Sequence, residues 1–397
     1  MNPLSPITAP DDRGGQSPPA PWRLPLDPLL ALAAAGLGVC SVMTLKSATR
    51  NLIPASPDYY VNRQALYLVI GFVLMLIASR LDYSRLRPYT RLIYGALIVS
   101  ILAVLAVGHA ARGSTRAISF PLFSFQASEV GKDLLILALA AFVVDRSRQL
   151  SQRDTTIRVV IGALIPAMLV IVQPDLGSGM VYMVIAYMLL FIAGTAWKQL
   201  AAIAALVLVA AAFVLVAAPA VGVHVLKPYQ TERLTAFLHP SSNPSKVGYQ
   251  QLESKIAIGA GQKTGRSGAP QTSLHFVPED QTDFVFAAVG EKYGFVGAGL
   301  VLLLFGLLIS RTLRILVMAK DLFGSLIAAG IAGMLMFQVF VNVGMTIGIM
   351  PITGVTLPLM SYGGSSVITT MLAVGLLQSI YVQARASAAL KGRVLRD

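Results

Sequence analysis

Long apolar runs follow one another along most of the chain, with short polar connections between them. A helix that crosses a membrane needs about 20 mostly apolar residues, and the runs approach or exceed that length. Reading them in order predicts ten spans, near residues 28–45, 64–82, 90–109, 129–145, 157–173, 176–194, 199–219, 284–310, 322–344 and 365–384. The pattern therefore predicts an all-α integral membrane protein with ten transmembrane helices.

The remaining residues divide into two tails and one long connection. Residues 1–27 are rich in proline and polar side chains, which is typical of a disordered tail, and they do not start like a secretory signal peptide. The ten-span membrane domain is predicted at residues 28–384, with a large extracytoplasmic loop at 220–283 between spans seven and eight. Residues 385–397 are expected to form a short basic cytoplasmic tail.

Lysine and arginine indicate the orientation, because they are enriched on the cytoplasmic side of membrane proteins. With the N-terminus placed inside, most basic residues of the short connections also fall inside. The short outer connections hold only Lys46, Arg50, Arg63, Arg112 and Arg116. We therefore expect both termini in the cytoplasm. Acidic residues determine topology only weakly, yet many fall on the outer half, which suggests that polar chemistry occurs there.

Composition supports a membrane protein and excludes other classes. Hydrophobic residues make up 55% of the 397 residues and charged ones only 12%, against about 25% in soluble domains. The net charge of +13 would ordinarily suggest a nucleic-acid partner. Because the basic residues are scattered between apolar runs, topology explains them and no nucleic acid is expected. One cysteine, Cys40, excludes a disulfide-stapled scaffold.

The fourth predicted span begins with ionisable residues at membrane depth. Glu129 and Lys132 are three residues apart, so on a helix they share a face. Such residues are a functional hypothesis by default. Two interpretations stay open: a structural ion pair that orients the span, or a site where Lys132, with Arg116 nearby, binds a phosphate-bearing ligand.

Asp175 follows Pro174 at the short connection between two spans. Proline ends the preceding helix, and an aspartate at this position can cap the next helix by accepting from its first free N–H groups. Capping is one interpretation of Asp175. The other places its carboxylate on the floor of a cavity that opens outward.

The end of the long loop is the densest acidic region of the chain and includes Glu279 and Asp283. Asp283 directly precedes the apolar run of span eight, so we expect it at the outer membrane–water boundary. A partly desolvated carboxylate there could act as a general base. The alternative is a cluster of helix caps, since threonine and aspartate are favoured before a helix.

The connection from Gly344 to Ser366 is uncharged and rich in glycine and proline, which predicts non-helical backbone lining a cavity. Ser361, Ser365 and backbone N–H groups could bind an anion there. A plain re-entrant turn without a ligand is the alternative. The sequence has no metal-ligand spacing, nucleotide-binding glycine motif or nucleophile elbow.

Five short motifs follow in order along the chain: Gln173-Pro-Asp-Leu-Gly177, Gly248-Tyr-Gln250, Pro278-Glu279 with Thr282-Asp283-Phe284, Gly344-Met-Thr-Ile-Gly348, and Leu357-Pro358 with Ser361-Tyr-Gly-Gly-Ser-Ser366. In this order and on ten spans, they resemble the SEDS family (shape, elongation, division and sporulation), which includes RodA, FtsW and SpoVE. The resemblance covers nearly everything after residue 28. The segment 254–265 is more similar to the elongation member RodA than to the division member FtsW.

This resemblance implies a peptidoglycan glycosyltransferase that polymerises lipid II into glycan strands. The reaction would take place at the outer face of the bacterial cytoplasmic membrane, for cell elongation and shape. A class B penicillin-binding protein, which crosslinks the strands, is the implied partner. The essential aspartate of the family falls on Asp283, and its other charged residues fall on Arg116, Glu129 and Lys132. Gln281 and Ala127 depart from the common family residues, which are histidine and proline.

The residues fit this chemistry, because the transfer needs a base for the acceptor hydroxyl and positive charge for the departing pyrophosphate. We expect Asp283 to be the catalytic base and Glu129 to orient Lys132. The predicted substrate-binding residues are Arg116, Glu129, Lys132, Asp175, Glu279, Ser361 and Ser365. A bound divalent cation, Mg²⁺ or Mn²⁺, could supply further positive charge, with ligands that the sequence does not identify.

Other functions stay open on the residues alone. A lipid II flippase suits ten spans and an outward cavity equally well. Its path should carry polar groups across the whole membrane, whereas the ionisable residues here are confined to the outer half and the cytoplasmic side. The division-type FtsW paralogue would perform the same chemistry. A non-catalytic scaffold for a penicillin-binding protein is a further alternative.

Overall fold

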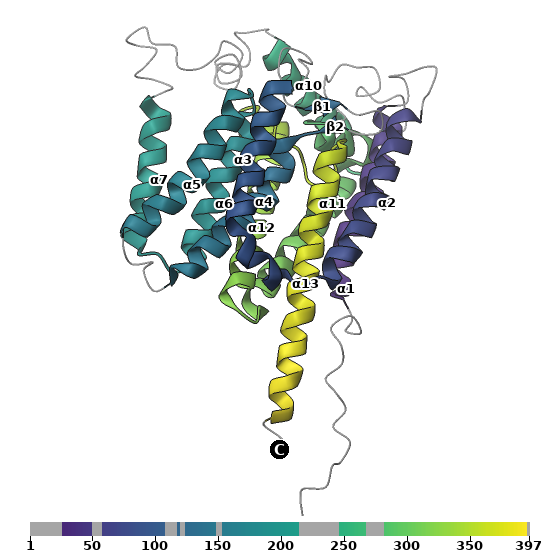
Figure 1. The fold of residues 1–397 in the computed structure, drawn as a ribbon. Helices are drawn as coiled ribbons and strands as arrows, with labels where there is room; N and C mark the ends of the chain where they lie inside the picture. The colour runs from purple at the N-terminus through teal and green to yellow at the C-terminus, as the bar shows by residue number, and fades with distance from the viewer. Residues whose placement is uncertain are drawn as a thin grey trace, which may run out of the picture.

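The computed structural model describes residues 26–49, 58–107, 117–119, 124–147, 153–213, 246–266 and 282–394, and they form a helical bundle (Figure 1). The helices are α1 (Pro28–Ala48), α2 (Tyr59–Arg80), α3 (Thr90–Val107), α4 (Ala127–Asp145), α5 (Arg153–Val172), α6 (Leu176–Ile192), α7 (Trp197–Ala212), α10 (Lys246–Ala260), α11 (Val285–Met318), α12 (Leu322–Ile347) and α13 (Gly364–Val394). A 3-10 helix, η2 (Tyr83–Tyr89), precedes α3. A short antiparallel pair, β1 (Ile118–Ser119) and β2 (Ser124–Phe125), precedes α4.

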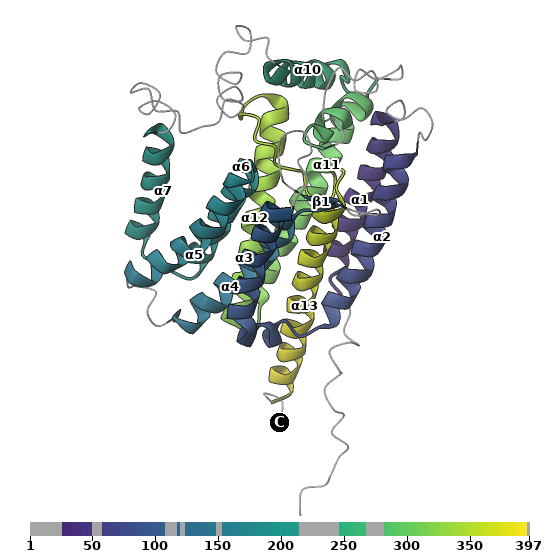
Figure 2. The ribbon, with the colours of Figure 1, turned by 45° about the horizontal axis from the view of Figure 1, so that its top comes forward.

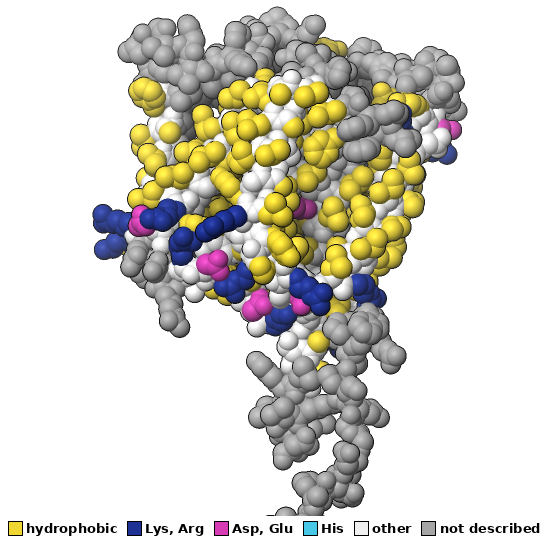
Figure 3. Space-filling model, viewed as in Figure 1, with side chains coloured by type: hydrophobic (Ala, Val, Ile, Leu, Met, Phe, Trp, Pro, Cys, Tyr) yellow, Lys and Arg dark blue, Asp and Glu magenta, His cyan; other side chains and the backbone are white. Residues whose placement is uncertain are grey.

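The bundle has the surface of a multi-pass membrane protein. Among the described helices, seven are long and apolar enough to cross a membrane, and α6 and α7 are shorter apolar helices. Hydrophobic side chains cover the flank seen in Figure 3, as expected for a surface that contacts lipid. Helix α4, which carries the charged pair Glu129 and Lys132, packs in the same bundle. The all-α membrane fold is confirmed, whereas ten spans stay a prediction.

Helix α12 lies inside the bundle, because most of its side chains are buried against α4, α6 and α11. On the other side of the bundle, α2 and α13 pack closely along their lengths. A Cβ atom on Gly375 of α13 would lie 2.7 Å from the carbonyl oxygen of Met75, so this approach depends on glycine. Helix α13 also continues to Val394, past residue 384 where the last span was predicted to end.

Part of the long predicted loop is helical. Helix α10 lies across the ends of α11 and α12 (Figure 2). The Gln251 side chain donates to the carbonyl oxygens of Met345 and Met350, at 3.3 and 3.0 Å, and Ser254 donates to that of Thr346 at 2.9 Å. These bonds hold the helix on the bundle. The rest of the loop, residues 220–245 and 267–281, lies outside the described residues.

One prediction about the uncharged connection is wrong at both of its ends. Residues 344–347 belong to α12, and α13 already begins at Gly364, so the non-helical segment covers only residues 348–363. Gly344 lies within α12, which ends at Ile347. The C-cap residue is Gly348, whose φ of 82° is the left-handed conformation that glycine favours.

The opposite end of the bundle from α10 is held by a buried ion pair. The side chain of Asp27 is 0% exposed, caps α1 by accepting from the N–H groups of Leu29 and Leu30, and accepts from Arg311 of α11. The backbone of Asp27 also exchanges two hydrogen bonds with the Gln378 side chain of α13. One aspartate thus joins three helices.

Replacing Asp27 with alanine is expected to lower the free energy of unfolding by about 3 kcal/mol, because it leaves a partly buried arginine without its partner and removes the cap of α1. The control is Asp154→Ala, which breaks the exposed ion pair with Arg158 and should cost at most about 1 kcal/mol. Unfolding of both purified proteins in detergent measures the difference. Equal losses would contradict the role of Asp27.

Candidate functional site

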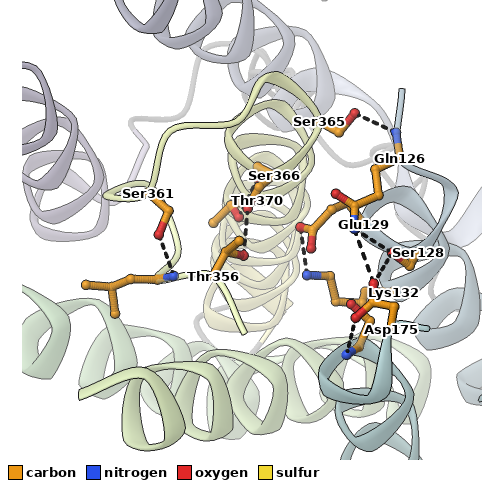
Figure 4. A network of polar contacts seen from close by, with 12 residues as sticks. Gln126, Ser128, Glu129, Lys132, Asp175, Thr356, Ser361, Ser365, Ser366 and Thr370 are labelled. Atoms are coloured by element: carbon orange, nitrogen blue, oxygen red, sulfur yellow. Dashed lines mark hydrogen bonds and ion pairs between the residues drawn. The ribbon is translucent and has the colours of Figure 1, made fainter. Parts of the chain in front are cut away.

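Four segments meet near the end of the bundle that carries α10: the start of α4, the start of α6, the start of α11, and the connection 348–363 with the beginning of α13. Figure 4 shows the polar side chains that several of them contribute. Hydrogen bonds between residues far apart in sequence join these segments. The predicted site residues that the structure describes lie on them.

Glu129 and Lys132 form the ion pair that their spacing predicts. The Lys132 Nζ atom lies 2.7 Å from Glu129 Oε2, and the two side chains are 3% and 5% exposed, respectively. A pair this deeply buried in a helix bundle is expensive to desolvate, so it needs a compensating role. In Figure 4 both side chains point from α4 toward α13. The pair is consistent with either interpretation, structural or ligand-binding.

Asp175 is the N-cap of α6, as predicted, and it also does more than cap. Its Oδ1 accepts from the N–H of Ser178 at 3.1 Å. Its Oδ2 accepts from Ser128 Oγ at 2.9 Å and from Gln126 Nε2 at 3.2 Å, both at the start of α4. One buried carboxylate therefore fixes the starts of α4 and α6 relative to each other. Its placement on the floor of a cavity stays a prediction.

Ser365 connects the start of α13 to the same polar group. Its hydroxyl donates to the carbonyl oxygen of Ser124 at 2.6 Å and accepts from the backbone N–H of Gln126 at 3.0 Å. Ser365 therefore holds the strand that leads into α4. Because Glu129 follows within one helical turn, this bond also fixes the position of the ion pair relative to α13.

Ser361 connects the same segment to α11. Its hydroxyl donates to the carbonyl oxygen of Thr282 at 2.6 Å and accepts from the backbone N–H of Leu357 at 2.8 Å. Between Leu357 and Ser361, the residue Leu359 has a φ of 62°, a left-handed conformation that is costly for leucine. The hydrogen bonds of Ser361 hold this turn in place. Ser361 thus positions the residue that immediately precedes Asp283.

Asp283 is half-buried at the start of α11. Its carbonyl oxygen accepts from Asn342 Nδ2 of α12 at 2.9 Å, and the same nitrogen donates to the carbonyl oxygen of Val355 at 2.8 Å. The N-cap residue of α11 is Phe284, whose side chain makes no capping bond. Both interpretations of Asp283, general base and member of a cap cluster, stay open.

Two predicted residues, Arg116 and Glu279, lie outside the described residues. Sequence reasoning missed Asn342, which sits fully buried in α12 and anchors Asp283. The sequence signal for Asn342 was an asparagine inside an apolar run, because a polar residue at membrane depth is costly to bury and therefore indicates a structural or functional role. Among the described residues, no three histidine, cysteine, aspartate or glutamate side chains gather to hold a metal ion.

Comparisons with known proteins agree with this fold. A family model described as "Cell cycle protein" (FtsW/RodA/SpoVE) matches residues 25–386. The peptidoglycan glycosyltransferase MrdB of Escherichia coli K12 is 36% identical over 363 residues, which cover 90% of this chain and 94% of that protein. The peptidoglycan glycosyltransferase RodA of Treponema pallidum is 34% identical over 80% of this chain and 88% of its own. A probable peptidoglycan glycosyltransferase FtsW of Thioalkalivibrio sulfidiphilus is 36% identical over 92% and 91%.

Solved structures show the same fold. A chain from a peptidoglycan synthase complex that coordinates polymerization and crosslinking superposes with a TM-score of 0.76 and 31% identity, covering 91% of this chain and 99% of that one. The rod shape determining protein RodA of Thermus thermophilus superposes with a TM-score of 0.63 and 28% identity, covering 91% and 98%.

The fold and the curated relatives define a multi-pass membrane enzyme of cell-wall synthesis. The chain belongs to the FtsW/RodA/SpoVE family, which confirms its resemblance to the SEDS proteins, and its enzyme class is peptidoglycan glycosyltransferase. Relatives named RodA and FtsW both match over most of the chain, so the comparisons do not distinguish between the RodA and the FtsW branches of the family.

Replacing Asn342 with leucine should leave the carbonyl oxygens of Asp283 and Val355 without a donor. We expect the free energy of unfolding to fall by about 1–3 kcal/mol. The rate of glycan formation should fall by about tenfold or more, because a small displacement of a reacting group is costly. The control is Phe340→Leu, at an exposed position of the same helix. Equal rates for the two variants would contradict an anchoring role.

Proposed function

We propose that this chain polymerises lipid II into glycan strands at the outer face of the bacterial cytoplasmic membrane, with Asp283 as the catalytic base. One observation carries the proposal. The segment 357–365 bonds to the residue before Asp283 through Ser361 and to the start of α4 through Ser365. A candidate base and a buried cation are thereby attached to one short piece of chain.

The distribution of charge supports the orientation. Most lysine and arginine side chains visible in Figure 3 gather around the end of the bundle where α13 leaves it. Basic residues are enriched on the cytoplasmic side, so this end faces the cytoplasm, and the α10 end with Asp283 faces outward. Both termini are then cytoplasmic, and the site lies toward the outer leaflet, on which the substrate is presented.

The proposed reaction is a single displacement at the anomeric carbon of the donor sugar. Asp283 takes the proton from the acceptor hydroxyl, whose oxygen forms the new bond to that carbon. The bond from the carbon to the pyrophosphate oxygen breaks, and the electron pair leaves with the undecaprenyl pyrophosphate. Lys132, oriented by Glu129, stabilises the growing negative charge together with Arg116. One displacement inverts the configuration of the donor carbon.

The remaining predicted binding residues have supporting roles. Asp175 and Ser365 hold the start of α4, so they position Lys132 rather than supply charge. Ser361 positions Asp283 through Thr282. Glu279 is proposed as a further acidic contact of the substrate, on the basis of its sequence position alone.

A divalent cation, Mg²⁺ or Mn²⁺, stays a prediction. The described residues do not gather the three acidic, histidine or cysteine side chains that would hold one, and no step above is assigned to a metal. Comparing the polymerisation rate with and without a chelator tests the requirement. A polymerisation rate that EDTA leaves unchanged would show that the reaction does not need a divalent cation.

The partner that we propose is a class B penicillin-binding protein, which would crosslink the strands. A likeness to a chain from a complex of polymerization and crosslinking supports this choice. The elongation role rests on the resemblance of the segment 254–265 to RodA. A division role like that of FtsW would use the same chemistry.

Replacing Asp283 with asparagine removes the base but keeps the size of the side chain. We expect polymerisation of lipid II by the purified protein to fall by about 100-fold or more, because a general base contributes at least about that factor. The unfolding temperature should stay close to that of the wild type. The control is Asp154→Asn, an exposed carboxylate of α5, which should polymerise normally. An Asp283→Asn protein with a normal rate would show that another group is the base.

A further inference from the structure

A cluster of tyrosines surrounds one arginine beside the candidate site. We call it the tyrosine–arginine cluster: Tyr59, Tyr60, Arg63 and Tyr67 of α2, and Tyr362 of the connection before α13. The Arg63 guanidinium lies 4.6 Å from the centroid of the Tyr59 ring. The Tyr60 and Tyr362 rings meet edge to face, with centroids 5.0 Å apart, and the Tyr67 and Tyr362 centroids are 6.3 Å apart.

This arrangement differs from an ordinary aromatic belt. Belt tyrosines anchor separate helices at the membrane–water interface. Here the rings contact one another and include Tyr362, which lies in a connection and not in a spanning helix. Tyr67 is only 3% exposed and forms the base of the cluster, whereas Tyr59 is 37% exposed at its margin. The result is one continuous surface that combines aromatic rings with a half-buried cation.

Hydrogen bonds connect the cluster to the candidate site. Gln64, one turn along α2, donates to the carbonyl oxygen of Ser361 at 3.2 Å and to Ser41 Oγ at 3.0 Å. Ser361 in turn bonds to Thr282, the neighbour of Asp283. The connection 348–363 therefore bonds to the cluster's helix, α2, at Ser361, and the first turn of α13 bonds to the strand before α4 at Ser365. The cluster and the Lys132 ion pair flank this connection on its α2 and α4 sides.

This order matters for the proposed reaction. If the pyrophosphate of the donor lies on the α4 side with Lys132, the acceptor must approach Asp283 from another side, and the α2 side carries the tyrosine–arginine cluster. The acceptor is a sugar. One face of a pyranose ring presents C–H groups, which pack favourably on the electron-rich face of an aromatic ring. Its hydroxyls accept hydrogen bonds, and a guanidinium offers five N–H donors.

The Tyr362 side chain interacts with both Tyr67 and Arg63 inside the cluster. Burial raises the pKa of Tyr362 well above its usual range. A lipid headgroup would need mainly the positive charge of Arg63, whereas a sugar uses the rings and the donors together.

We propose that the tyrosine–arginine cluster binds the sugar rings of the acceptor glycan and holds them beside Asp283. Tyr59 and Tyr362 pack against the sugars, and Arg63 donates to their hydroxyls. The role of the bound sugar as acceptor rests on the proposed function, but the binding itself can be measured without any catalysis.

The test is the binding of a lipid-free glycan tetrasaccharide, with its stem peptides removed, to the full-length protein in detergent by titration calorimetry. Tyr59→Ala and Arg63→Ala should each raise the Kd by about threefold to tenfold, which is the range of one aromatic or charged contact. Tyr59→Phe, which keeps the ring, should bind nearly as the wild type does. The controls are Tyr89→Ala and Arg91→Ala, exposed residues near the opposite end of the bundle.

Each result has a defined meaning. Equal Kd values for the wild type, Tyr59→Ala and Arg63→Ala overturn the inference. So does a result in which these variants lower only the unfolding temperature in lipid nanodiscs, because the cluster is then a membrane anchor. In lipid II polymerisation, the two variants should give shorter glycan products than the controls. A wild-type protein that binds the tetrasaccharide but forms no glycan contradicts the proposed function and leaves the binding site standing.

Discussion

A polar site inside an apolar bundle must satisfy its own hydrogen bonds, because neither lipid nor a hydrophobic core offers partners. This constraint explains the architecture around the connection 348–363. Glu129 and Lys132 neutralise each other, and Asp175 accepts from three donors on two helices. Asp175, Ser361 and Ser365 each bond to a group from another element. The polar network is therefore also the scaffold that fixes these helix ends relative to one another.

Rigidity of this kind suits a glycosyltransferase. A displacement reaction needs its base, its electrophilic carbon and its charge-stabilising groups in fixed relative positions. Ser361 and Ser365, four residues apart, tie the start of α11 and the start of α4 to one segment. The strained backbone at Leu359 lies between Leu357 and Ser361, and the hydrogen bond between these two residues holds it. The same segment carries Tyr362, which extends the site toward α2.

The sequence allowed good predictions where the physics is local. Apolar runs located most helices, the three-residue spacing predicted the Glu129–Lys132 pair, and a proline followed by aspartate predicted the cap at Asp175. Contacts over long separations were beyond reach. Asn342 and Asp283 are 59 residues apart, and Ser361 and Thr282 are 79 apart. Helix α10 was missed because polar side chains, Gln251 and Ser254, attach it to the bundle, so no long apolar run marks it.

The central claim is that this chain itself joins sugars, rather than carrying lipid II across a membrane or supporting another polymerase. The most direct test incubates the purified wild-type protein with lipid II in detergent, without a membrane to cross and without any other protein. The account predicts glycan strands with the inverted linkage at the donor carbon. Lipid II that remains intact under these conditions would contradict it and favour a flippase or a scaffold.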